Sequence, residues 1–260
     1  MTILDRLAEH ARERVEQAKR RVSPATMLRT AQALPRGDFP FEKALRTPGV
    51  SFICECKKAS PSKGLIAPDF PYLDIARDYE AAGADAISVL TEPKWFLGAD
   101  AYLAEIAAAV KVPCLRKDFI VDEYMICEAK MLGAAATLLI CAILEEPQLR
   151  DYLALCGELG LSALVEAHDE TEIEKALRSG ARIIGVNNRN LKDFSVDTNN
   201  SGRLRALVPD GLLFVAESGI KTPEDVATLR EAGVDAVLVG EALMRAADKK
   251  AMLSALRGAQ

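Results

Sequence analysis

The chain has 260 residues, enough for one large domain or two small ones, and half of them are hydrophobic, which allows a sizeable core. Its 33 lysines and arginines are outnumbered by 38 aspartates and glutamates, so the overall charge favours neither a nucleic-acid nor an anionic-membrane partner. No apolar run reaches the roughly 20 residues that a membrane span requires. Because the net charge is negative, any binding of an anion such as phosphate must depend on a local group of residues.

The N-terminal residues and the cysteines indicate the compartment. Residues 1–21 form a charged amphipathic pattern without the apolar core of a signal peptide. The six cysteines are scattered through apolar runs, which is typical of a reduced, cytoplasmic protein; they are Cys54, Cys56, Cys114, Cys127, Cys141 and Cys156.

Residues 3–34 carry helical periodicity with many charges, and the Pro and Gly of "LPRGDFPFEKAL" break it before a second short helix. We interpret residues 1–48 as an N-terminal helical extension of a single domain. Residues 49–260 then alternate short apolar runs with helical patterns. The predicted strands are 50–57, 86–90, 112–117, 136–140, 162–166, 183–187, 213–217 and 236–239.

A repeated helix end supports eight βα units. The segments "AAGADA", "MLGAAA", "RSGARI" and "EAGVDA" place Gly83, Gly133, Gly180 and Gly233 before the second, fourth, sixth and eighth predicted strands. Glycine at a helix end adopts a positive φ and lets the chain turn directly into a buried strand. Eight near-equal units favour an α/β fold of the (βα)8 TIM-barrel type over a doubly wound open sheet.

Strand alternation separates the charged residues from the cysteines in "FICECKKASPSKG". Glu55 and Lys57 share the parity that we assign to the barrel interior, whereas Cys54 and Cys56 point toward the helices. The Cys-x-Cys pair does not indicate a metal site, because no second ligand cluster follows and His10 and His168 stand alone. Lys58 and Lys63 are interpreted as parts of a solvated loop.

Other strands also end in polar groups at one end only. These groups are Lys117, Glu166, the pair Asn187 and Arg189, and Ser218. Singly they have structural explanations, since Glu166 could cap the next helix and Lys117 could pair with Asp118 or Asp122. Together they predict one active site, because barrel enzymes draw catalytic groups from several strand ends.

The last two loops indicate what this site binds. "ESGI" and "VGEAL" present Gly219 and Gly240 with free backbone N–H groups, the second at a helix start, and Ser60 could close the same pocket. That is the usual phosphate position of a TIM barrel. The substrate should be a small phosphorylated metabolite.

Seven segments, read together, closely resemble indole-3-glycerol phosphate synthase. They are "ECKKASPSKG", "SVLTEPKWFLG", "LRKDFIVDEYMI", "LVEAH", "IIGVNNRNL", "VAESGI" and "LVGEALM", in order over residues 50–245. The resemblance implies an anthranilate-derived substrate, 1-(2-carboxyphenylamino)-1-deoxyribulose 5-phosphate, which undergoes ring closure, decarboxylation and dehydration. The N-terminal helix matches the family's extra helix.

The resemblance also assigns site residues. It implies catalytic and orienting positions at Glu55, Lys57, Lys117, Glu166, Asn187 and Ser218, an anthranilate-carboxylate contact at Arg189, aromatic walls at Phe96 and Phe119, and a phosphate cradle at Ser60, Gly219 and Gly240. Glu241 stands where some members have Ser, so a hydroxyl contact to phosphate is not expected there.

The chemistry requires groups of these kinds. Ring closure needs an acid at the ketose oxygen, for which Lys117 is the candidate. Dehydration needs an acid and a base, assigned to Lys57 and Glu55, with Glu166 stabilising the cationic intermediate; these last roles could be exchanged. No cofactor is expected, because the cationic ring intermediate itself accepts the electrons of decarboxylation.

Three alternatives remain open at this point. A buried barrel lysine, Lys57 or Lys117, also suits a Schiff-base aldolase, which borohydride would trap. A sugar-phosphate isomerase or a non-enzymatic phosphate-binding protein would share the fold. A monomer is favoured, and the N-terminal helix could cover the barrel mouth or pack against another subunit.

Overall fold

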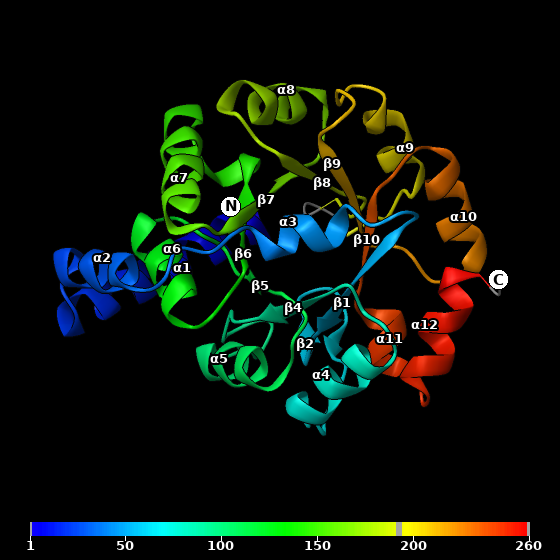
Figure 1. Ribbon diagram of the computed structural model, residues 1–260, viewed down its shortest axis with the longest axis horizontal. Coiled ribbons are helices and arrows are strands. Elements are labelled where there is room, and N and C mark those ends of the chain that lie inside the picture. The colour runs from blue at the N-terminus through cyan, green and yellow to red at the C-terminus, as the bar shows by residue number, and fades with distance from the viewer. Residues whose placement is uncertain (1, 191–193, 259–260) are drawn as a thin grey trace.

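Eight parallel strands form the centre of the molecule. The computed structural model describes residues 2–190 and 194–258, and in it the strands close into a barrel in the order β1-β10-β9-β8-β7-β6-β5-β4 (Figure 1). Their bounds are β1 Ser51–Cys56, β4 Ala86–Leu90, β5 Cys114–Lys117, β6 Ala136–Ile140, β7 Ser162–Ala167, β8 Ile183–Asn187, β9 Leu213–Glu217 and β10 Ala236–Val239. The predicted (βα)8 barrel is confirmed, and the open sheet was the wrong alternative.

Helices surround the strands, as the alternating pattern predicts. They are α4 Tyr72–Ala81, α5 Asp100–Ala109, α6 Glu123–Met131, α7 Glu146–Leu159, α8 Glu170–Ser179, α9 Asn199–Arg205, α10 Pro223–Glu231, α11 Glu241–Arg245 and α12 Lys249–Arg257, with a 3-10 turn at Cys141–Ile143. The four recurring glycines follow the ends of α4, α6, α8 and α10 with φ of 89°, 80°, 89° and 80°, and each lies three residues before the first residue of a barrel strand. The role predicted for them is confirmed.

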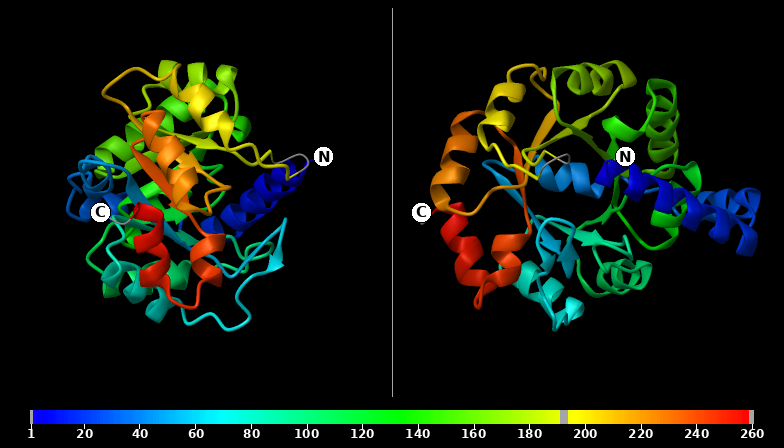
Figure 2. Two further views of the ribbon diagram at one scale, coloured as in Figure 1. Left: turned by 90° about the vertical axis from the view of Figure 1, so that its right-hand side faces the viewer. Right: turned by 180° about the vertical axis from the view of Figure 1, so that it is seen from behind.

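The N-terminal extension consists of three helices. Residues 3–34 form two helices instead of one, α1 Ile3–Arg21 and α2 Pro24–Ala33, because Ser23 caps the second helix and Pro24 occupies its first position. A third helix, α3 Pro40–Leu45, follows. Figure 1 has α3 in front of the ring of strands, whereas α1 is in front when the molecule is seen from behind in Figure 2.

The two helices at the barrel ends close it differently. Phe41 and Leu45 of α3 join the apolar cluster inside the barrel, and the Glu42 N–H donates to the Ser162 hydroxyl at the start of β7 (3.2 Å). Helix α3 therefore plugs the end where the strands begin. Helix α1 lies at the opposite end, where the strands finish, because its residues Ile3 and Leu7 line the cavity at that end.

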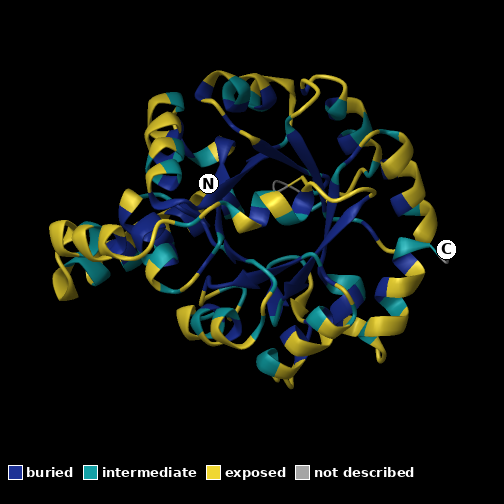
Figure 3. Ribbon diagram, viewed as in Figure 1, coloured by how far each residue is buried: buried dark blue, intermediate teal, exposed yellow. Residues whose placement is uncertain are grey.

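Strand alternation divides the core into two layers. Ile53 belongs to the cluster inside the barrel, whereas Phe52, Cys54 and Cys56 pack between barrel and helices, as predicted. The strands are buried along their length and the outer helix faces are exposed (Figure 3). All six cysteines are buried and free, and burial raises the pKa of Cys127 to about 11 and of Cys156 to about 12, so the thiols are poor nucleophiles.

Two local differences from the predicted elements have physical reasons. The strand predicted at 112–117 begins at Cys114, since Pro113 has no N–H to donate and contributes only its carbonyl, to Ile87 (3.0 Å). The loop after β1 contains a short hairpin of β2 Ala59–Ser60 and β3 Gly64–Leu65. Within the described residues, no helix has both the length and the apolar character to cross a bilayer.

Candidate active site

A cavity of about 720 Å³ opens at the carboxyl ends of the barrel strands. All of the site residues predicted from the sequence line it: Glu55, Lys57, Ser60, Phe96, Lys117, Phe119, Glu166, Asn187, Arg189, Ser218, Gly219 and Gly240. They come from seven different strand ends and the loops that follow, so the fold brings together residues up to 185 positions apart in the chain. Leu191, the last residue of the motif "IIGVNNRNL", lies outside the described residues.

Glu55 and Lys57 form a close ion pair inside the barrel. Lys57 Nζ lies 2.6 Å from Glu55 Oε1, and the Ser88 hydroxyl donates to the other carboxylate oxygen (3.4 Å). Burial would raise the pKa of Glu55, but Lys57 and Lys117 outweigh it and hold that pKa below its ordinary value. Gly240 makes the space for this pair, because a Cβ there would lie 2.5 Å from Glu55 Oε1.

Lys117 is the cation at the centre of an acidic cluster. Its Nζ lies 3.6 Å from Glu166 Oε2 and 3.4 Å from Glu217 Oε2. Burial alone would lower the pKa of Lys117, but Glu217, Glu166 and Glu55 together raise it above the ordinary lysine value. A Schiff-base nucleophile must be a neutral amine, whereas this environment keeps Lys117 protonated and so counts against an aldolase lysine.

The structural explanations considered for Lys117 and Glu166 are wrong. Asp118 pairs with Arg14 of α1 (2.6 Å) and Asp122 with Lys19 (2.7 Å), which leaves Lys117 to the cavity. Helix α8 is capped by the side chain of Asp169, which accepts the Glu172 N–H (2.9 Å), and Glu166 points into the barrel. Both residues therefore line the cavity and are not engaged in the structural contacts considered for them.

Glu217 belongs to the site and was missed in the sequence prediction. Leu213 and Val215 of β9 lie inside the barrel, and the same alternation places Glu217 there, only 1% exposed. Burial raises the pKa of Glu217 to about 7, with Glu166 adding to the rise and Lys117 opposing it. Alternation along "LFVAE" would have identified it, but the prediction assigned the strand end to Ser218 instead.

His168, which looked isolated in the sequence, lies between two carboxylates. Its Nδ1 is 3.0 Å from Glu172 Oε2 and its Nε2 is 3.4 Å from Glu166 Oε1. Burial would lower the pKa of His168, but the hydrogen bond with Glu172 and the charge of Glu166 raise it to about 9. Glu166 therefore lies between two cations, with His168 beside its Oε1 and Lys117 beside its Oε2.

Phe96 and Phe119 form an aromatic wall with ring centroids 6.0 Å apart. Helix α1 contributes to the same wall, since Ile3 and Leu7 line the cavity and Leu7 joins the interior cluster that contains Phe119. The extra helix therefore covers the barrel mouth. Arg189 lines the cavity from the loop after β8, where its N–H donates to Asn187 Oδ1 (3.0 Å) and its guanidinium to the Phe194 carbonyl (3.1 Å).

The two glycine loops line the cavity at the ends of β9 and β10. Ser218 and Gly219 both adopt positive φ, 67° and 85°, and a Cβ on Gly219 would lie 2.6 Å from Val196 Cγ1. Gly240 directly precedes α11. Lys63 was predicted to be part of a solvated loop. The structure shows that it also lines the cavity, with its Nζ 3.9 Å from Glu241 Oε1. It supplies a cation beside the glycines.

No group of three or more His, Cys, Asp or Glu residues in the described ranges is arranged to hold a metal ion. The barrel, the Lys and Glu cluster at its carboxyl end and the glycine loops beside it are typical of a phosphate-binding (βα)8-barrel enzyme that works by acid–base chemistry.

Comparison with known proteins gives the particular family. Residues 4–256 match the family model described as indole-3-glycerol phosphate synthase. A protein of that name from Ruminiclostridium cellulolyticum is 54% identical over 98% of this chain and 99% of its own. Another from Lacticaseibacillus paracasei is 54% identical over 98% of both chains. The chain belongs to the indole-3-glycerol phosphate synthase family, as its motifs predict.

Solved structures share the fold at low sequence identity. A crystal structure of 3-hexulose-6-phosphate synthase aligns with a TM-score of 0.63 and 15% identity, covering 80% of this chain and 98% of that one. A structure titled "Native KDPGal structure" aligns at 0.56 and 16% identity, with 81% and 93% covered. These likenesses concern the barrel alone.

Proposed function

We propose that this enzyme converts 1-(2-carboxyphenylamino)-1-deoxyribulose 5-phosphate into indole-3-glycerol phosphate, carbon dioxide and water. Family membership over nearly the whole chain supports the reaction. The observation that supports the assignment of roles is the partly buried Lys117 ammonium, which lies between Glu166 and Glu217 in the cavity.

Binding orients the two ends of the substrate. Arg189 donates hydrogen bonds to the anthranilate carboxylate, and Phe96 and Phe119 enclose the aromatic ring of the substrate. Ser60, Gly219 and Gly240 receive the phosphate, with Lys63 adding positive charge. This arrangement stretches the substrate across the charged cluster, so that the ketose carbonyl lies over Lys117.

Lys117 acts in ring closure. The aromatic carbon that bears the carboxylate attacks the ketose carbon, a carbon–carbon bond forms, and Lys117 gives its proton to the carbonyl oxygen. The resulting cationic intermediate loses carbon dioxide and takes up the electrons of the broken bond, so no cofactor is required. Glu166 stabilises the positive charge, and Glu217, whose pKa is about 7, restores the proton of Lys117.

Dehydration completes the indole. Lys57 protonates the departing hydroxyl and Glu55 removes the ring proton, which is consistent with their 2.6 Å contact at the end of β1. Asn187 and Ser218 orient the substrate at the ends of β8 and β9. The pair acts as one unit, since protonation of either group alters the charge of the other.

Product analysis with the purified protein tests this proposal. Incubation with the carboxyphenylamino-deoxyribulose phosphate should produce indole absorbance and fluorescence with one equivalent of carbon dioxide. Substrate that is isomerised without loss of carbon dioxide would favour a sugar-phosphate isomerase. A borohydride-trapped adduct on Lys57 or Lys117 would favour an aldolase.

We further propose a monomeric, cytoplasmic enzyme folded as one domain, with residues 1–48 as the extension. Its six buried free cysteines suit a reducing compartment. The net charge of −5 supports neither a nucleic-acid nor an anionic-membrane partner. Sedimentation at micromolar concentration would test the monomer, and a dimer mass would contradict it.

A further inference from the structure

Glu92 is a buried acid that lies outside the catalytic cluster. Its side chain is 0% exposed, in the loop between β4 and α5, within the segment "TEPKWFLG" that carries Phe96. One carboxylate oxygen accepts the N–H of Lys94 (3.0 Å), and the other accepts those of Trp95 (2.7 Å) and Phe96 (3.0 Å). A buried carboxylate is stable only when it is well bonded, and Glu92 gets these bonds from the backbone of its own loop.

The loop that Glu92 organises has a constrained shape. Leu97 adopts a positive φ of 52°, and the Gly98 N–H donates to the Glu92 carbonyl (2.8 Å). Gly98 packs so closely that a Cβ there would lie 2.3 Å from the Leu90 carbonyl oxygen. Side-chain and backbone bonds of Glu92 thus fold the loop into a compact turn. The ring of Phe96 reaches the cavity from this turn.

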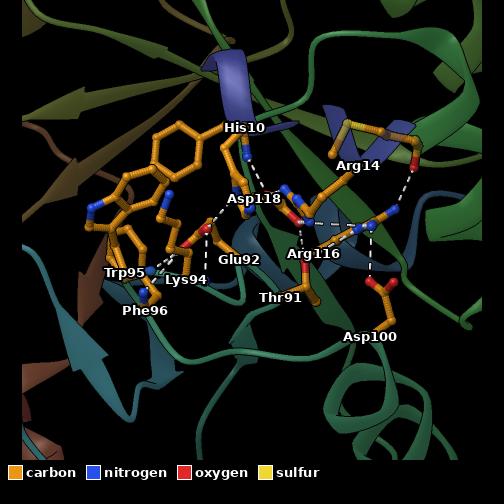
Figure 4. A network of polar contacts seen from close by, with 12 residues as sticks. His10, Arg14, Thr91, Glu92, Lys94, Trp95, Phe96, Asp100, Arg116 and Asp118 are labelled. Carbon is orange, nitrogen blue, oxygen red and sulfur yellow. Dashed lines mark hydrogen bonds and ion pairs between the residues drawn. The ribbon is translucent and has the colours of Figure 1, made fainter. Parts of the chain in front are cut away.

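Helix α1 contacts this turn and the neighbouring loop (Figure 4). His10 Nδ1 lies 3.3 Å from Glu92 Oε1, and the His10 ring packs edge-on against Trp95, with centroids 5.4 Å apart. One helical turn later, Arg14 binds Asp118 through both terminal nitrogens (2.6 and 3.1 Å).

Asp118 repeats the arrangement beside the second wall residue. It accepts the N–H of Phe119 (2.8 Å) and the hydroxyl of Thr91 (2.6 Å). Phe96 and Phe119 therefore each come after a buried carboxylate in the chain, and that carboxylate accepts their backbone N–H. Both carboxylates also contact the same face of α1.

We propose that Glu92 is a positioning residue, which places Phe96 against the aryl end of the substrate and links this placement to helix α1. The aryl ligand rests on the function proposed above, whereas the shape of the loop does not. Substitution with Gln tests the idea finely: an amide keeps one acceptor oxygen but turns an NH2 group toward at least one backbone N–H.

The fluorescence of Trp95 reports the conformation of the loop directly. Trp95 is the single tryptophan of the chain, and its backbone N–H donates to the Glu92 carboxylate. Without substrate, E92Q should change the emission maximum of Trp95 and its quenching by acrylamide. D100N is the matched control, since Asp100 lies in the same network through Arg116 (2.9 Å) but touches none of the loop amides. Spectra of E92Q that equal those of wild type would overturn the proposal, whether or not the enzyme makes indole.

Kinetics then separate positioning from a general loss of stability. E92Q should raise KM about tenfold, because the loss of one aromatic contact weakens binding by up to about that factor. The kcat per folded molecule should change less than about threefold. The Kd for inorganic phosphate should not change, because the glycine loops are intact. D100N should retain the KM of wild type.

A double-mutant cycle asks whether Glu92 acts through Phe96. F96A alone should raise KM, and E92Q combined with F96A should raise it no further. Additive effects, an unchanged KM in folded E92Q, or a parallel loss of phosphate affinity would each overturn the proposal. None of these results would affect the assignment of Lys117.

Discussion

Replacing His168 by Gln tests whether the ring behind Glu166 is a cation in the folded protein. The pKa of His168 is raised from 6.5 to about 9, because Glu172 and Glu166 outweigh the effect of burial. The difference corresponds to about 3 kcal/mol of folding stability as an upper bound, at about 1.4 kcal/mol per pH unit.

The sign of the effect follows from the direction of the change. The folded protein holds the proton more tightly than the unfolded chain, so the stabilisation is complete below pH 6.5 and is lost as the pH rises through about 9. The stability advantage of wild type over H168Q should therefore shrink by up to about 3 kcal/mol across this window.

Urea unfolding at about pH 6 and about pH 9.5 measures this difference. E172Q should lose part of the same pH dependence, because the hydrogen bond to Glu172 is the largest contribution that raises the pKa of His168. A stability difference between wild type and H168Q that stays constant, or that grows with pH, would refute the reasoning.

Three further predictions concern the site. R189A should raise KM more than about tenfold with little change in kcat, and an unchanged KM and Kd would contradict the carboxylate contact. G219A should weaken inorganic phosphate binding, since φ is 85° and the new Cβ would meet Val196; wild-type phosphate affinity would count against the cradle. In wild type, kcat should fall as the pH rises through about 7, where Glu217 loses the proton that it returns to Lys117, and E217Q should lack this inflection. The same inflection in E217Q would show that another group causes it.

Local patterns predicted the barrel and most of the cavity. Gly83 and its three counterparts marked the helix ends, and period-2 alternation correctly turned Glu55 and Lys57 inward and Cys54 and Cys56 outward. The same rule could have identified Glu217, because it depends only on the neighbouring apolar residues of β9.

Other features depend on contacts between distant segments, and no local pattern carries them. Arg14 meets Asp118 across 104 positions, and His10 meets Glu92 across more than 80. A charged helix gives no sign of which buried carboxylate it will pair with, so the sequence left two positions for α1, over the mouth or against another subunit. The place of Lys63 also depends on the β2 and β3 hairpin, which is too short to be seen as a periodic pattern.

The central claim is that Lys117 donates the proton in ring closure, and single-turnover comparison of wild type with K117A tests it most directly. Removal of a general acid should lower the rate of indole formation by about 10² to 10⁴-fold, while thermal unfolding shows a folded protein and phosphate Kd is unchanged. K117A that forms indole at a near-native single-turnover rate would contradict the claim.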